Sequence, residues 1–113
     1  MKLTVLLDNS TIIDRYFLAE PAVCYSLEDG DARILLDTGY SGVFLQNACA
    51  MGLDLSHVTD IVLSHGHNDH TGGLAAFFDE FPHTHVRLTA CPGVFAPRRD
   101  GAGHSIGSPM ALP

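Results

Sequence analysis

Positively charged residues are scarce in this chain of 113 residues. It has 6 Lys and Arg against 13 Asp and Glu, so its formal net charge is −7 with neutral histidines. A nucleic acid or an anionic membrane surface needs a basic patch, so we expect neither as a main partner. Divalent cations are compatible with this charge and with the seven histidines. Charged residues make up only 17% and hydrophobic residues 46% of the chain, which is typical of one globular domain.

Paired cysteines and long apolar runs are also missing. The three cysteines, Cys24, Cys49 and Cys91, lie far apart and form no CxxC pair, so we expect a reducing compartment rather than a disulfide framework. Cys24 and Cys49 fall in apolar segments, which predicts that both are small core residues. No apolar stretch approaches the ~18 residues that cross a bilayer. Asp8 cuts short the apolar run at the N-terminus, so we expect a cytoplasmic protein.

Short apolar runs separated by turn residues predict an α/β fold with helices laid on a sheet. Strands are expected at residues 3–7, 22–27, 32–36, 61–64 and 86–90. Helices are expected at residues 41–51 and 74–81. Asp29-Gly30 predicts a tight hairpin between the second and third strands. Ser41 is the expected N-cap of the first helix, and Gly52 is its natural C-terminal stop.

The last part of the chain differs in composition from the rest. Four Pro and four Gly fall within the 22 residues of segment 92–113, and no periodic apolar face continues there. We interpret this segment as a Gly/Pro-rich loop or tail, and residues 1–91 as the packed domain. His104 in the tail would reach a metal only if the tail folds back or a second copy associates. The pair Arg98-Arg99 is expected to be solvated.

One short polar segment carries the strongest chemical signal. Three histidines and one aspartate, His65, His67, Asp69 and His70, occur within six residues after a predicted strand. Imidazole nitrogen and carboxylate oxygen are ligands of divalent ions such as zinc, although these ligand types leave iron and manganese open. Gly66 allows a tight turn, so that His65 and His67 converge on one ion while Asp69 and His70 face a second. A solvated polar loop that is merely rich in histidine is disfavoured by this spacing.

Other candidate residues carry weaker signals. Asp37 ends a predicted strand before Thr-Gly, where aspartate is common in ordinary turns. We favour a role in which its carboxylate accepts a hydrogen bond from a metal-bound histidine and orients that ring. His83 and His85 also alternate, but no further ligand type adjoins them, so we expect exposed loop histidines.

The segment LSHGHNDHTGGL, residues 63–74, resembles the HxHxDH signature of the metallo-β-lactamase superfamily. LLDTG, residues 35–39, resembles the Asp-Thr-Gly that follows a strand beside the metal site in that superfamily. The segments LLDN, residues 6–9, and PGVF, residues 92–95, together with Ile106-Gly107, resemble one branch of the superfamily. That branch contains metal-dependent hydrolases and dihydropterin ribofuranosyl-aminobenzene-phosphate synthase-like proteins. The resemblance implies the N-terminal half of an αββα sandwich: a mixed sheet with helices on one face, formed as a half-domain by residues 1–91.

The resemblance also implies a function. His65 and His67 would bind the first metal, Asp69 and His70 the second, and Asp69 would act in catalysis by orienting the attacking water. The implied protein is a hydrolase of a small-molecule ester, amide or phosphoester with up to two divalent ions, zinc first among them. The family's remaining ligands, two histidines and a bridging aspartate, would lie beyond residue 113. The alternative is a truncated, non-catalytic metal-binding half-domain that needs a partner or forms a homodimer.

Overall fold

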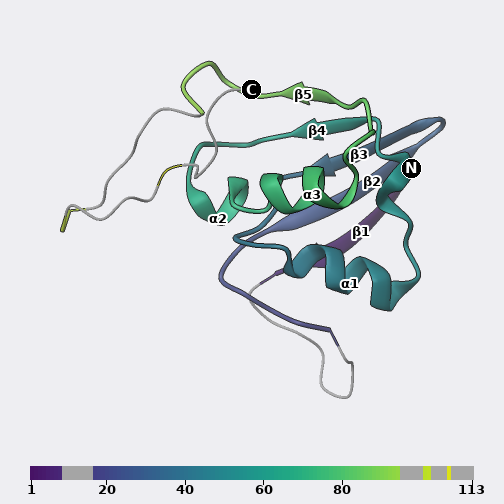
Figure 1. The fold of residues 1–113 in the computed structure, drawn as a ribbon, viewed down its shortest axis with the longest axis horizontal. Coiled ribbons are helices and arrows are strands. Elements are labelled where there is room, and N and C mark those ends of the chain that lie inside the picture. The colour runs from purple at the N-terminus through teal and green to yellow at the C-terminus, as the bar shows by residue number, and fades with distance from the viewer. Residues whose placement is uncertain (9–16, 95–100, 103–106, 108–113) are drawn as a thin grey trace.

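The computed structural model describes residues 1–8, 17–94, 101–102 and 107. Five strands form one sheet in the order β1-β2-β3-β4-β5 (Figure 1). The strands are β1 (Lys2–Leu7), β2 (Cys24–Asp29), β3 (Ala32–Leu36), β4 (Asp60–Val62) and β5 (Arg87–Thr89). The helices are α1 (Val43–Met51), α2 (Asn68–Thr71) and α3 (Leu74–Glu80), with a 3₁₀ turn at Leu55–His57. Neither the single turn of α2 nor the 3₁₀ turn was expected from the sequence.

The sheet is mixed, as expected. Strands β1, β2 and β3 pair antiparallel, whereas β3, β4 and β5 run parallel. The predicted hairpin between β2 and β3 is confirmed, but its loop is Gly30-Asp31, because Asp29 still pairs with Ala32. Gly30 has φ +57°, a conformation that glycine adopts without a steric penalty. The parallel strands are joined by crossover connections that contain α1, α2 and α3. Because β3, β4 and β5 run in the same direction, their carboxyl ends meet at one edge of the sheet.

The helices cover one face of this sheet (Figure 1). Side chains alternate along each strand, and the residues that turn toward the helices are buried. Phe44 from α1 and Phe77 from α3 are both fully buried. A side chain of this size contributes roughly 1.5–3 kcal/mol when it leaves water. The core also contains Leu6, Leu7, Ala22, Cys24, Leu35, Ala48, Leu55, Val58, Ile61, Leu63, Leu74 and Val94.

Helix α1 begins and packs differently from the prediction. Its N-cap is Gly42, and no side chain caps it, so the expectation for Ser41 is wrong. The Ser41 hydroxyl donates instead to the carboxylate of Glu20 at 3.0 Å. Gly52 does end the helix in the left-handed conformation, at φ 71°. Cys49 is exposed rather than buried, since the buried positions of α1 include Asn47 together with Phe44 and Ala48.

The opposite side of the sheet, which we call the outer sheet face, is also apolar. Leu3 lies opposite Leu27, which lies opposite Ile34, so the three side chains share this face. Leu3 and Val5 are about half exposed, at 58% and 47%. The apolar residues of the outer sheet face are Leu3, Val5, Tyr25, Leu27, Ile34, Leu36 and Val62. Such a face needs a covering layer.

The chain stays in contact with the fold beyond residue 91. Val94 is 2% exposed and belongs to the core. Gly107 is buried and forms an isolated antiparallel bridge with His67. The predictions for Arg98-Arg99 and His104 concern positions outside the described residues. In the portion of the chain that the structure covers, no helix has the length and apolarity to cross a membrane.

Candidate metal centre

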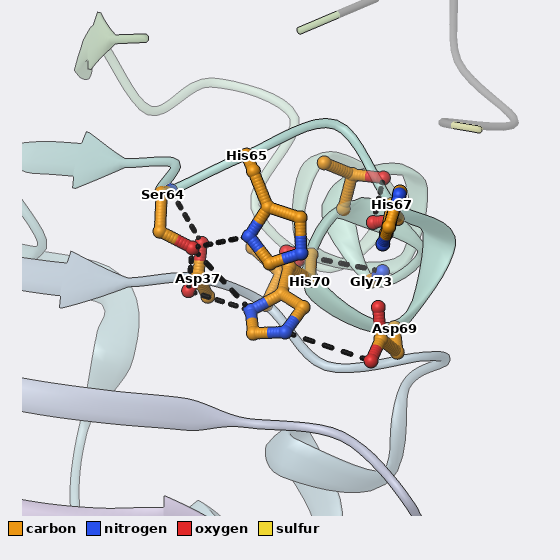
Figure 2. A network of polar contacts seen from close by, with 9 residues as sticks. Asp37, Ser64, His65, His67, Asp69, His70 and Gly73 are labelled. Atoms are coloured by element: carbon orange, nitrogen blue, oxygen red, sulfur yellow. Dashed lines mark hydrogen bonds and ion pairs between the residues drawn. The ribbon is translucent and has the colours of Figure 1, made fainter. Parts of the chain in front are cut away.

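The polar residues singled out in the sequence gather at the carboxyl ends of β3 and β4 (Figure 2). Asp37 follows β3, while Ser64 and His65 follow β4. Because β3 and β4 are parallel neighbours, these residues come to the same edge of the sheet. Helix α2 then turns the chain back and presents Asp69 and His70 toward His65.

His65, Asp69 and His70 form one cluster. Each offers a ligand atom, and these atoms lie within 4.8 Å of one another. Two imidazoles and one carboxylate make three protein ligands, the number usual in catalytic zinc sites, with the remaining position left for water or substrate. The residues present therefore fit a divalent ion.

His67 lies beside this group but is not a member of it among the described residues. Its ring stands edge-on to the ring of His65, with centroids 4.8 Å apart. The rings of His65 and His70 are closer, at 4.1 Å. The grouping thus joins His65 to Asp69 and His70, whereas the sequence predicted that His65 pairs with His67. The roles of all four residues as metal ligands stay a prediction.

Asp37 supports the cluster through hydrogen bonds. Its carboxylate is buried and accepts three hydrogen bonds: from the Ser64 amide at 2.8 Å, the Ser64 hydroxyl at 2.7 Å and His70 Nδ1 at 2.8 Å. The sequence predicted a contact between Asp37 and a histidine, and the role of Asp37 in orienting a metal ligand stays a prediction. Every one of these bonds is made to an ionised acceptor, which makes them stronger than neutral hydrogen bonds.

The network assigns the protons of two histidine rings. A carboxylate accepts only, so His70 donates through Nδ1, and in the neutral ring Nε2 keeps a free lone pair. Nε2 of His70 lies 3.5 Å from Asp69 Oδ2, on the side of the cluster. Ser64 donates its hydroxyl proton to Asp37 and accepts from Nδ1 of His65 at 3.0 Å. In its neutral form each ring therefore presents an unprotonated Nε2, the form that binds metal.

Thr38 fastens the helix that carries His70. The amide and hydroxyl of Thr38 both donate to the carbonyl of His70, at 2.8 and 3.0 Å. Its hydroxyl also accepts from the amide of Gly73 at 3.2 Å. A Cβ at Gly73 would stand 2.2 Å from the Thr38 carbonyl oxygen, so this close approach needs glycine. The loop after β3 and the start of α3 are thereby locked together.

The electrostatics favour the neutral form of the His65 ring. Partial burial lowers the pKa of His65, and the neighbouring His70 and His67 lower it further because a second positive charge would be repelled. Asp37 and Asp69 act in the opposite direction more weakly. A proton therefore competes less effectively with a metal ion for His65.

Sequence reasoning missed several residues of this region. Ser64 precedes His65 and Thr38 follows Asp37, but short polar residues in loops give no distinct signal of such a role. Glu20 also contacts the loop after β3 and lies far from it in sequence. The exposed residues His83 and His85 join no three-residue ligand group in the described portion of the chain.

Comparison with known proteins gives a consistent result. The model of the metallo-beta-lactamase superfamily matches residues 18–90. A lactamase-like protein of Pestalotiopsis microspora is 37% identical over 81 residues, covering 67% of this chain and 23% of that protein. The uncharacterized protein YobT of Bacillus subtilis (strain 168) is 32% identical over 72 residues, covering 61% of this chain and 30% of YobT.

Solved structures share the fold. Tm1679, described as a metal-dependent hydrolase of the beta-lactamase superfamily, superposes with a TM-score of 0.71 at 31% identity, covering 94% of this chain and 36% of Tm1679. The metallo-beta-lactamase SMB-1 gives a TM-score of 0.55 at 26% identity, covering 81% of this chain and 40% of SMB-1. The chain spans well under half the length of each of these relatives.

Proposed function

This chain belongs to the metallo-β-lactamase superfamily, and from that premise we propose that it is a metal-dependent hydrolase with its centre at His65, Asp69 and His70. The observation that carries the proposal is the convergence of these three side chains on a hydrogen-bond network that leaves both Nε2 atoms free. Burying the Asp37 carboxylate costs solvation free energy, and its position behind His70 supports a use of that ring as a metal ligand.

The bound ion would supply a water of lowered pKa and would polarise the bond to be broken. His65 and His70 would hold it through Nε2, with His67 at a second position, and up to two ions are proposed. Zinc is the first choice, with iron or manganese as alternatives, because imidazole and carboxylate ligands suit all three. Asp37 keeps the His70 ring in place. Asp69 would be the third ligand of the centre and, as the proposed catalytic residue, would also accept a hydrogen bond from the attacking water and orient it.

The proposed substrates are small molecules with an ester, amide or phosphoester bond. The free cysteines, of which Cys49 and Cys91 are exposed, are in keeping with a cytoplasmic location. The alternative of a truncated, non-catalytic half-domain is not favoured, since it gives no reason for the ordered contacts between Asp37, Ser64 and His70.

We also propose that a second copy of this chain covers the outer sheet face. The charged residues Asp60 and Arg87, on the strands at the far side of this face, lie 3.8 Å apart and offset each other. A second apolar sheet would therefore meet no unpaired charge from this pair. Stacked sheets of this kind pack about 10 Å apart and bury apolar side chains from both layers.

Native mass spectrometry of protein grown with zinc, iron and manganese tests the metal and the copy number together. We expect a metal-loaded dimer. The double variant His65→Ala/His67→Ala should lose the metal, whereas the matched variant His83→Ala/His85→Ala should keep it. Unchanged metal content in the first variant would refute the centre.

Activity and association need separate measurements. A panel of p-nitrophenyl esters, phosphodiesters and a chromogenic β-lactam should show turnover that Asp69→Asn lowers even at saturating metal concentration. No turnover on any of them by a metal-loaded protein would count against the hydrolase. In sedimentation, Val5→Glu should shift the dimer to monomer, while Leu18→Glu, at a position 48% exposed elsewhere, should not. A wild-type monomer at all concentrations would refute the proposed dimer.

A further inference from the structure

Glu20 makes a set of contacts that neither its sequence context nor the proposed reaction explains. It lies in the segment before β2, twenty positions away from the residues it binds. One carboxylate oxygen accepts from the amides of Tyr40 and Ser41, at 2.8 and 3.2 Å. The other accepts from the Ser41 hydroxyl at 3.0 Å. Three donors from one turn thus converge on a single half-buried carboxylate.

The turn that Glu20 binds is the loop of residues 37–41 after β3. Two of its residues have positive φ, Asp37 at 57° and Gly39 at 72°. A non-glycine residue in this region is strained, so other contacts must hold it there. The amides of Asp37, Thr38 and Gly39 donate to carbonyls of β4, α2 and the segment before β2. The last two amides of the loop donate to Glu20, so each of its five backbone N–H groups has a partner.

The other end of the same loop touches the metal centre. The carboxylate of Asp37 holds the ring of His70, and Thr38 holds the backbone carbonyl of His70. A change in the loop conformation would therefore move both the ring and the helix that carries it. We propose that Glu20 is a positioning residue for His70, acting through the loop of residues 37–41; this rests on the proposed metal-dependent function.

The rival explanation is that Glu20 merely ties its segment to the body of the fold. The chain offers a matched control for that explanation in Asn47. Asn47 is 2% exposed, and its side chain binds the backbone of Leu18, two residues from Glu20. The side-chain oxygen of Asn47 accepts from the Leu18 amide and its side-chain nitrogen donates to the Leu18 carbonyl, each at 2.8 Å. It also binds the carbonyl of Leu6 at 2.8 Å. Asn47 therefore anchors the same segment through hydrogen bonds to Leu18 and Leu6 rather than to the loop of residues 37–41.

Three variants of the full chain separate the two explanations: Glu20→Ala, Glu20→Gln and Asn47→Ala. The first readout is zinc affinity by competition with a chromophoric chelator, at a temperature where all variants are folded. The second is the ¹⁵N chemical shift of the His70 ring in metal-free protein, which reports whether Nδ1 keeps its proton. The third is the urea midpoint of the metal-free protein.

We expect Glu20→Ala to weaken zinc affinity by about tenfold, the lower end of what outer contacts of metal ligands contribute. Its His70 ring should lose the fixed Nδ1–H form. Glu20→Gln should restore most of the affinity, because its amide oxygen can accept from both backbone amides. Asn47→Ala should lower the urea midpoint and leave zinc affinity and the His70 shift unchanged.

Two outcomes overturn the proposal: wild-type affinity and an unchanged His70 shift in Glu20→Ala, or an equal loss of affinity in Asn47→Ala. Failure of the proposed function looks different. Wild-type protein would then bind no zinc, and the His70 shift in metal-free protein alone would decide the role of Glu20.

Discussion

Replacing Asp37 by Asn tests the centre of the hydrogen-bond network with little change of shape. Asn adopts positive φ at least as readily as Asp, so the backbone at φ 57° is not disturbed. The change removes one acceptor oxygen and adds a donor. In the wild-type protein three donors point at Asp37, two of them from Ser64 and one from His70. An amide cannot accept all three.

The two orientations of the new amide have different consequences. If its oxygen faces His70, its NH₂ group faces the Ser64 amide, and an unsatisfied buried donor costs about 1–3 kcal/mol. If its NH₂ group faces His70, that ring must accept on Nδ1 and moves its proton to Nε2. The proton then occupies the nitrogen that binds metal, and we expect zinc affinity to fall about 10- to 100-fold.

Zinc competition, urea unfolding of the metal-free protein and ¹⁵N spectra of His70 measure these effects. Asp60→Asn is the control, since Asp60 pairs only at 3.8 Å with the exposed Arg87 and such pairs contribute at most about 1 kcal/mol. The reasoning is refuted if Asp37→Asn keeps wild-type zinc affinity, wild-type stability and the Nδ1–H form of His70.

Three further changes test other parts of the structure. Burial raises the pKa of the Cys24 thiol, so Ellman's reagent should modify the two exposed cysteines rapidly and Cys24 only after unfolding; fast reaction of all three would contradict its burial. Gly73→Ala should destabilise the protein by about 2–3 kcal/mol, because its Cβ would meet backbone at 2.2 Å, while Gly101→Ala, with nothing within 4 Å, should change unfolding free energy by less than about 0.5 kcal/mol. The pKa of His65 in the folded state lies below the ordinary 6.5. Between these two pKa values the unfolded chain binds more protons than the folded chain, so the stability of the metal-free protein should rise with pH up to about 6.5. His65→Asn should flatten this rise in the urea midpoint, and an unchanged slope would show that the pKa is not lowered.

Local sequence patterns predicted most of the elements correctly. The strand at residues 32–36 has the predicted bounds, and α3 differs by a single residue at its end. These segments have a clear apolar run and a turn residue at each boundary. The errors occur where a distant residue competes for a local group. Ser41 is no N-cap because its hydroxyl donates to Glu20. The predicted core residue Cys49 is exposed, and Asn47 takes a buried position of α1 because the backbone of Leu6 and Leu18 satisfies its amide.

The composition of the candidate centre could also be read from the sequence, but its grouping could not. Spacing brings four ligand types together within six residues, yet it does not tell which side chains share a side. The turn at residues 66–67 and helix α2 rotate Asp69 and His70 toward His65, and leave His67 beside the group. That rotation depends on Thr38, which binds the carbonyl of His70 from the loop after the neighbouring strand β3.

The α/β alternation, the family and the residue types of the centre could all be predicted from the sequence, because each depends on short-range order along the chain. The folded arrangement was needed to show which donors satisfy Asp37, which nitrogen of His70 contacts it, and how Glu20 reaches the loop of residues 37–41. These features depend on residues 20 to 33 positions apart. The contacts of Asp37 with Ser64 and His70 require the parallel pairing of β3 and β4, which brings these strand ends together. A hydrogen bond joins atoms about 3 Å apart whatever their separation along the chain, so local sequence patterns do not reveal it.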